Sequence, residues 1–105
     1  MKFTTYVPTT DNAGTAFATK WLKRVIDRFW QPFHAMSNEG IVEGYWTADD
    51  GVVYHDFCMK ISIECDRNRL QELMGRVRRL GRKLGQLVMY IEVSGYDGVQ
   101  FLRIT

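Results

Sequence analysis

The sequence predicts an α+β domain in which an antiparallel sheet carries two helices on one face. Three observations predict it. The chain has 105 residues, which is enough for one hydrophobic core. Two segments have apolar residues at helical spacing, and the segments between them are rich in β-branched and aromatic residues. We therefore expect one domain over residues 1–105.

The N-terminal third predicts a strand and then a helix. Lys2 to Val7 is rich in β-branched and aromatic side chains and is followed by Pro8, which cannot donate to a ladder. After the turn-rich segment Thr9 to Gly14, apolar residues recur from Ala16 to Trp30 at steps of one, three or four, with basic residues opposite. This spacing predicts one amphipathic helix.

The middle of the chain predicts a hairpin. Two β-rich segments, Ile41 to Thr47 and Val52 to Cys65, flank a short turn that contains Asp-Gly, a strong hairpin signal. The preceding segment, Gln31 to Gly40, has no clear pattern, and we interpret it as a loop. In the second strand one face is apolar and packs on helices, whereas the other meets water or another subunit.

The last third predicts a second helix and two more strands. We expect Asp66 or Asn68 to cap the helix and Gly85 to end it. Leu87 to Val93 then alternates as a strand, and Val99 to Ile104 is an additional one. The order β-α-β-β-α-β is the ferredoxin-like split βαβ plan with one added C-terminal strand. Because two helices cover only one face of the sheet, we expect an oligomer.

Composition and motifs argue against several classes of protein function. The net charge of +2 is far below that of a protein held to nucleic acid by bulk charge, and the sequence has no RNP signature or central pair of stacking aromatics. We therefore interpret the arginines of the second helix as a solvated face and expect no nucleic-acid partner. No phosphate-binding glycine loop or GxSxG motif is present.

The sequence also indicates the cellular location of the protein and the redox state of its two cysteines. The sequence has no apolar run that would span a membrane and no signal peptide, so we expect a cytoplasmic protein without a membrane partner. Cys58 and Cys65 are an odd number of residues apart in one strand, so they face opposite ways and we expect reduced thiols. We expect neither a metal site nor a cofactor, since no CxxC or nearby histidine accompanies them.

Candidate site residues gather at strand ends around the hairpin and the fourth strand; they are Tyr45, Trp46, Tyr54, His55, Asp56, Tyr90 and Glu92. Asp56 interrupts an apolar run, so it either points into a cleft or is an acid that protects an edge strand. Glu92 is a site residue or an exposed residue of the open sheet face. His55 is equally interpretable as a surface histidine, and the pair Tyr45-Trp46 as core or interface.

The hairpin also resembles a known group of proteins. The segments GYWTADDGVVYHDFCMKISIECD (Gly44 to Asp66) and GQLVMYIEVSG (Gly85 to Gly95), with an amphipathic helix between them, resemble the trimeric PII-like and CutA-type proteins. The resemblance covers about half the chain. The phage-encoded S-adenosylmethionine lyases, trimers that bind substrate in clefts between subunits, use the same plan and are the nearest enzymatic family.

The resemblance implies a site and a reaction. By position it assigns catalytic roles to Tyr45 and Asp56 and ligand binding to Glu92, although the family has glutamate where this chain has Asp56. From the same hairpin we add Trp46, Tyr54 and His55 as further ligand-binding candidates. In the lyase reaction the carboxylate of S-adenosylmethionine displaces methylthioadenosine from its own γ-carbon and forms homoserine lactone, so the enzyme needs no general base.

Three classes of function stay open at this point. The first is a homotrimeric S-adenosylmethionine lyase. The second is a PII-like or CutA-like module that binds a metabolite, a nucleotide or a metal without turnover. The third is a structural or nucleic-acid-binding oligomer. The turn Ala48 to Gly51 is too short for the long loop of PII-type sensors, which disfavours nucleotide-triggered signalling.

Overall fold

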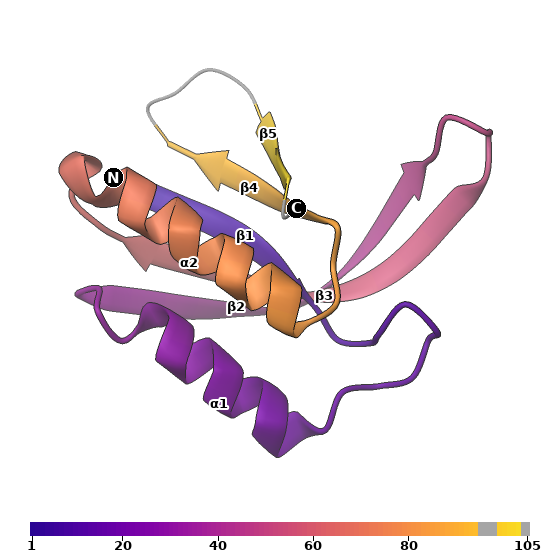
Figure 1. Ribbon diagram of the computed structural model, residues 1–105, viewed down its shortest axis with the longest axis horizontal. Helices are drawn as coiled ribbons and strands as arrows, with labels where there is room; N and C mark the ends of the chain where they lie inside the picture. The colour runs from indigo at the N-terminus through magenta and orange to yellow at the C-terminus, as the bar shows by residue number, and fades with distance from the viewer. Residues whose placement is uncertain (95–98, 104–105) are drawn as a thin grey trace.

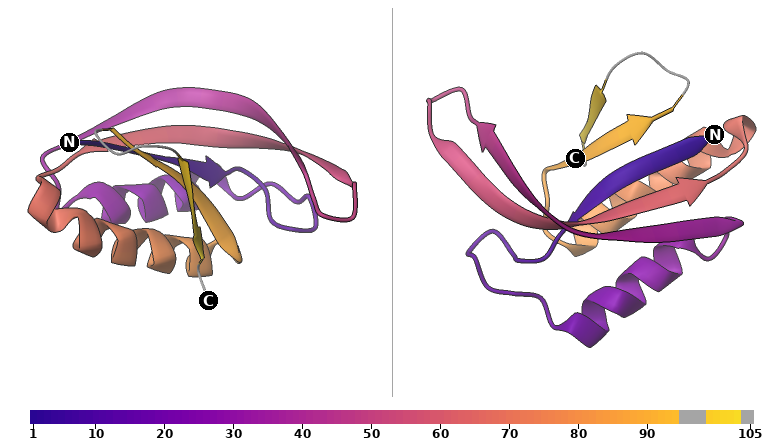
Figure 2. Two further views of the ribbon diagram at one scale, coloured as in Figure 1. Left: turned by 90° about the horizontal axis from the view of Figure 1, so that it is seen from above. Right: turned by 180° about the vertical axis from the view of Figure 1, so that it is seen from behind.

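The computed structural model of the chain describes residues 1–94 and 99–103 (Figure 1). It confirms the predicted α+β, ferredoxin-like arrangement: a five-stranded antiparallel sheet in the order β2-β3-β1-β4-β5 has both helices on one side (Figure 2). In chain order the elements are β1 (Lys2–Pro8), α1 (Thr19–Trp30), β2 (Ala35–Thr47), β3 (Val53–Glu64), the 3-10 turn η1 (Arg67–Arg69), α2 (Leu70–Lys83), β4 (Val88–Val93) and β5 (Val99–Arg103).

The core lies between the sheet and the helices. Strand β1 is central and pairs antiparallel with β3 on one side and β4 on the other. Alternate residues of these strands are fully buried against the helices, as the two-residue period of a strand requires; they include Phe3, Val7, Ile61, Ile63 and Ile91. Helix α1 contributes Leu22, Val25, Ile26 and Phe29 to the same cluster, and α2 contributes Leu73, Val77 and Leu80.

Strand β2 begins earlier than the sequence predicts. It starts at Ala35 rather than at Ile41, and its first residues pair with the end of β3, from Ala35 opposite Glu64 to Asn38 opposite Ile61. The register then shifts between Asn38 and Ile41, where Gly40 has a φ of 92°. A bulge of this kind breaks the alternation that identifies a strand in sequence, so pairing with β3 decides the structure here.

Both helix starts differ from the prediction. Helix α1 begins at Thr19, because Ala16 forms an isolated bridge with Thr10 and is not yet helical. Before α2 the chain makes the turn η1, and Asp66 precedes this turn without a side-chain cap hydrogen bond. The residue that precedes α2 is Arg69, so neither Asp66 nor Asn68 caps this helix.

The end of α2 is as predicted. Gly85 has a φ of 70°, in the left-handed region that favours glycine. Its N–H donates to the carbonyl of Arg82 at 3.1 Å, and the N–H of Gln86 donates to the carbonyl of Gly81 at 2.8 Å. These two bonds form a Schellman motif, which satisfies carbonyls that the helix leaves free.

The C-terminal strand forms an edge of the sheet. Strand β5 pairs antiparallel with β4 of the same chain, from Val88 opposite Arg103 to Glu92 opposite Val99. The predicted turn at residues 95–98 and the predicted strand end at Ile104 lie outside the described residues. Within the described part of the chain, no helix is long and apolar enough to cross a membrane.

Candidate functional site

The β2–β3 hairpin extends well beyond the rest of the sheet. Strand β1 ends at Pro8, opposite Cys58, so the hairpin has no neighbouring strand past this point. We call residues 41–57 the wing; it projects to one side of the molecule (Figures 1 and 2). At its tip Gly51 has a φ of 83° and donates to the carbonyl of Ala48 at 2.9 Å, which closes the turn.

One face of the wing carries a ladder of rings. This helix-side face continues the side of β3 that packs on the helices. The rings of Tyr45 and His55 stack with centroids 4.5 Å apart, and the ring of Phe57 follows 4.9 Å from His55. Glu43 accepts a hydrogen bond from the Tyr45 hydroxyl and lies 3.1 Å from Nε2 of His55. The Tyr45 hydrogen bond, more than the nearby His55, lowers the pKa of Glu43.

The other face of the wing, the open-side face, combines aromatic rings with a free carboxylate. The rings of Trp46 and Tyr54 stack with centroids 4.7 Å apart, and 55% and 44% of these residues are exposed. Asp56 follows on the same face of β3 and makes no hydrogen bond or ion pair with the described residues. Gly44 is its partner on β2, so no side chain stands opposite Asp56. This surface can accept a flat ring beside a cation.

Cys58 lies next to Asp56 on the open-side face. Its burial, and secondarily the charge of Asp56, raise the pKa of the Cys58 thiol to about 11. Burial also raises the pKa of the Cys65 thiol. Both cysteines are free, as the sequence predicts. At neutral pH the protonated thiol dominates, so Cys58 is a poor nucleophile there.

We expect alkylation of Cys58 to report the charge of Asp56. In a Cys65→Ser background, reaction with iodoacetamide at pH 8 is expected to run about one hundredfold slower than with a free thiol of pKa near 9. The change Asp56→Asn removes a negative charge that opposes the thiolate, so it speeds the reaction. Asp49→Asn, at the wing tip, serves as the control. If both variants react at the parent rate, Asp56 does not face Cys58.

A second polar cluster lies on the uncovered face of the sheet. Glu92 accepts a hydrogen bond from the Tyr90 hydroxyl at 2.8 Å and a longer one from the Tyr6 hydroxyl at 3.5 Å. The two tyrosine rings meet edge to face, 5.0 Å apart. Burial is the largest cause that raises the pKa of both phenols, and Glu92 adds to it; the pKa of Tyr90 rises to about 12. These tyrosines therefore act as neutral donors that hold the carboxylate of Glu92.

Next to this cluster, charged side chains form a row across the same sheet face. Glu39 pairs with Lys2 and Lys60, each at 3.1 Å. Beneath them Thr4 and Ser62 share a buried hydrogen bond of 3.0 Å. The uncovered face is therefore polar and internally bonded.

The strand order separates Asp56 from Glu92 within one chain. Glu92 pairs with Thr4 on β1, and Thr4 pairs with Ser62 on β3. Asp56 is on the same face of β3 as Ser62 but six residues away along the strand, which is roughly 20 Å. The two carboxylates thus share one face of the sheet without meeting.

Hairpin pairing also divides the predicted residues. Because Tyr45 pairs with His55 and Gly44 with Asp56, Tyr45 and His55 point away from Asp56. Trp46, Tyr54 and Asp56 share the open-side face, which is continuous with the face that carries Glu92. Of the seven candidate residues, three therefore lie together on one side of the wing and two on the other, while Tyr90 and Glu92 meet on the uncovered face of the sheet.

Sequence reasoning missed Tyr6 and Glu43. Tyr6 meets Tyr90 edge to face on the uncovered face of the sheet and reaches Glu92. Its place in β1, between the inward-facing Thr5 and Val7, signals an outward side chain. Glu43 precedes Tyr45 by two residues, the spacing of neighbours on one strand face.

The described residues contain no cluster of metal-binding side chains, and neither pocket on the helices includes a candidate site residue. No group of three or more metal-binding side chains occurs among them. The two pockets on the helices are lined by residues of α1 and α2 and include none of the seven candidate residues.

Comparison with known proteins relates the fold to that of an enzyme. No protein-family model and no curated protein matches the sequence. Among solved structures the chain is similar to a phage SAM lyase in complex with S-methyl-5'-thioadenosine, with a TM-score of 0.64 and 13% identity over 97% of this chain and 88% of that one. The chain shares that fold. A phage SAM lyase in the apo state gives the same TM-score at 15% identity, over 97% and 87% of the two chains.

Proposed function

We propose that the protein is a homotrimeric S-adenosylmethionine lyase whose clefts form between neighbouring copies. The observation that carries this proposal is the open-side face of the wing, where the free carboxylate of Asp56 lies beside the exposed rings of Trp46 and Tyr54. The fold similarity to phage SAM lyases over 97% of the chain supports it.

The chemistry of the wing suits a sulfonium ligand. Residues 41–57 contain four acidic side chains and no lysine or arginine, so the wing attracts cations; the acids are Glu43, Asp49, Asp50 and Asp56. An indole or phenol face can stack on an adenine ring and also attract a positive charge. Asp56 would then balance the sulfonium while Trp46 and Tyr54 hold the base.

The second half of the cleft comes from another copy in this proposal. Within one chain Asp56 and Glu92 are too far apart for one ligand, yet both belong to the same face of the sheet. A neighbour whose sheet packs over the wing would add Glu92, with Tyr6 and Tyr90 holding its carboxylate. Such a neighbour would also cover the exposed rings of Trp46 and Tyr54 on the open-side face.

The reaction needs few protein groups. A carboxylate oxygen of the substrate forms a bond to its own γ-carbon, and the bond from that carbon to the sulfonium breaks with its electron pair on sulfur. The products are homoserine lactone and neutral methylthioadenosine, and no proton moves. The protein holds the reacting carboxylate in line with the sulfur and stabilises the charge that changes.

The proposal gives Tyr45 and His55 a different place from Asp56. They lie on the helix-side face of the wing, so they cannot contact a ligand that Asp56 of the same chain binds. They would line a cleft only toward another neighbour. Within the chain they hold Glu43.

Incubation with S-adenosylmethionine tests the proposal. We expect reverse-phase chromatography to detect methylthioadenosine that accumulates with time and with protein concentration. Light scattering on the same sample is expected to give the mass of a trimer. Unchanged S-adenosylmethionine, or a monomeric mass for an active protein, would contradict the proposal.

The second candidate function is binding without turnover. It is favoured by the small number of catalytic groups, because a carboxylate beside stacked rings is sufficient to bind a cationic nucleoside. Calorimetry separates the two candidates. Binding of S-adenosylmethionine without any methylthioadenosine would support the second one, and turnover would support the lyase.

A further inference from the structure

Charge is divided between the two layers of the molecule. Helices α1 and α2 carry nine basic and two acidic side chains, whereas the rest of the chain carries five basic and ten acidic ones. The net charge of +2 therefore hides a strongly positive helix layer. Both helical acids have contacts of their own: Asp27 accepts from the indole N–H of Trp30 at 3.2 Å, and Glu72 pairs with Arg69 at 2.9 Å.

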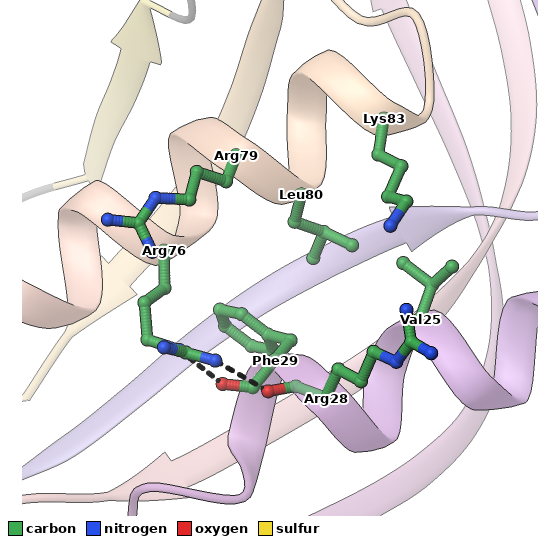
Figure 3. A pocket seen from close by; sticks show the side chains of 7 residues that line it. All are labelled: Val25, Arg28, Phe29, Arg76, Arg79, Leu80 and Lys83. Atoms are coloured by element: carbon green, nitrogen blue, oxygen red, sulfur yellow. Dashed lines mark hydrogen bonds between the residues drawn. The ribbon is translucent and has the colours of Figure 1, made fainter.

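A pocket of about 120 Å³ lies between the two helices, and its lining is positively charged (Figure 3). Four basic side chains line it, one from α1 and three from α2, and no acid does; they are Arg28, Arg76, Arg79 and Lys83. Val25, Phe29 and Leu80 form its apolar wall. An apolar wall lowers the local dielectric constant, which strengthens the field of the cations.

Arg76 is fixed in place by the backbone of α1. Its Nε donates to the carbonyl of Phe29 at 2.9 Å, and its Nη2 donates to the carbonyl of Arg28 at 2.6 Å (Figure 3). These carbonyls belong to the last turn of the helix, which favours a positive charge. Arg76 therefore links the two helices, and two hydrogen bonds hold its guanidinium in place at the pocket.

The other three cations have no acidic partner. Among the described residues, Arg28, Arg79 and Lys83 form no ion pair with a carboxylate. Arg28 and Lys83 reach from opposite helices toward the same space beside Val25 (Figure 3). Like charges that converge on one space repel each other, and a bound anion relieves that repulsion.

We propose that this pocket binds a short chain of phosphate groups, such as an oligophosphate. Guanidinium groups match phosphate oxygens in pairs, and several phosphates match several cations. The volume of about 120 Å³ accommodates phosphate groups but not a whole drug-sized ligand, for which pockets of roughly 300 Å³ or more are usual. The site lies on the helix layer, away from the wing, and it is independent of the proposed lyase activity.

Calorimetry with inorganic tripolyphosphate at physiological salt tests this site. We expect one tripolyphosphate per chain, and the double variant Arg79→Gln, Lys83→Gln is expected to weaken binding at least about tenfold. The matched control is Lys20→Gln, Lys23→Gln, which removes two charges from the same layer. These control residues are exposed and line a separate hollow that contains its own acid, Asp27. The control is expected to weaken binding only slightly.

Three results would overturn the proposal. Absence of binding, or equal weakening by both double variants, would mean that the helix layer is only a diffuse cationic surface. Tighter binding of a DNA duplex than of tripolyphosphate would point to an extended nucleic-acid surface. A smaller oligomer in the Arg79→Gln, Lys83→Gln variant would mean that acids of a second copy fill the pocket.

Discussion

The variant Asp56→Asn is expected to lose cleavage of S-adenosylmethionine by at least about one hundredfold while the fold and the oligomer persist. Asp56 is exposed and has no partner among the described side chains, so the change to asparagine costs the protein no contact of its own. In the proposed lyase it removes the charge that faces the sulfonium. Steady-state formation of methylthioadenosine measures the loss.

Two further variants serve as controls for this result. Asp49→Asn makes the same chemical change in the turn of the same hairpin and is expected to stay within about threefold of the parent. Asp56→Glu restores the charge, and glutamate is the residue that the lyase resemblance places there, so this variant is expected to keep activity. If Asp56→Asn reacts like the parent, Asp56 is an acid that protects the strand edge.

Mixing two inactive variants is expected to restore activity. In the proposed trimer each cleft takes Asp56 from one copy and Glu92 from the next, so Asp56→Asn or Glu92→Gln alone is expected to damage every cleft. In trimers reassembled from an equal mixture, about one quarter of the clefts combine an intact Asp56 with an intact Glu92. The mixture should therefore reach roughly one quarter of the parent rate.

The same mixing experiment excludes a site within one chain. If both carboxylates acted from the same copy, no mixed trimer would hold an intact pair, and the mixture would stay inactive. Mixing without dissociation and reassembly is the control, and it should give no activity. A mixture that stays inactive after reassembly, as judged by mass spectrometry of the intact mixed trimers, would contradict a cleft between copies.

The order of the helices and strands could be predicted from the sequence. The exact residues at which some of them begin could not. Apolar spacing in α1 and α2 and the Asp-Gly turn after Asp49 are local signals, and they predicted the fold correctly. The early start of β2 at Ala35 depends on its pairing with Glu64 and on a bulge, neither of which leaves a periodic pattern. The predicted cap of α2 was wrong for a similar reason, because the turn η1 lies between Asp66 and the helix.

The strand face of each candidate residue could be predicted from the sequence, whereas the contacts that it makes could not. The interrupting acid marked Asp56, and strand alternation already separates it from His55. The stack of Tyr45 on His55 needs the register across the hairpin, and the bond from Tyr6 to Glu92 needs the order of β3, β1 and β4. Contacts between distant strands are set by packing of the whole sheet.

The most direct test of the account is the origin of the γ-oxygen in the product. S-adenosylmethionine is incubated with the protein in ¹⁸O-labelled water, and the products are quenched early and analysed by mass spectrometry. We expect methylthioadenosine together with unlabelled homoserine lactone, because the proposed nucleophile is the substrate's own carboxylate. Homoserine labelled at its γ-hydroxyl would mean that water attacks the γ-carbon, and unreacted S-adenosylmethionine would mean that the protein is not a lyase.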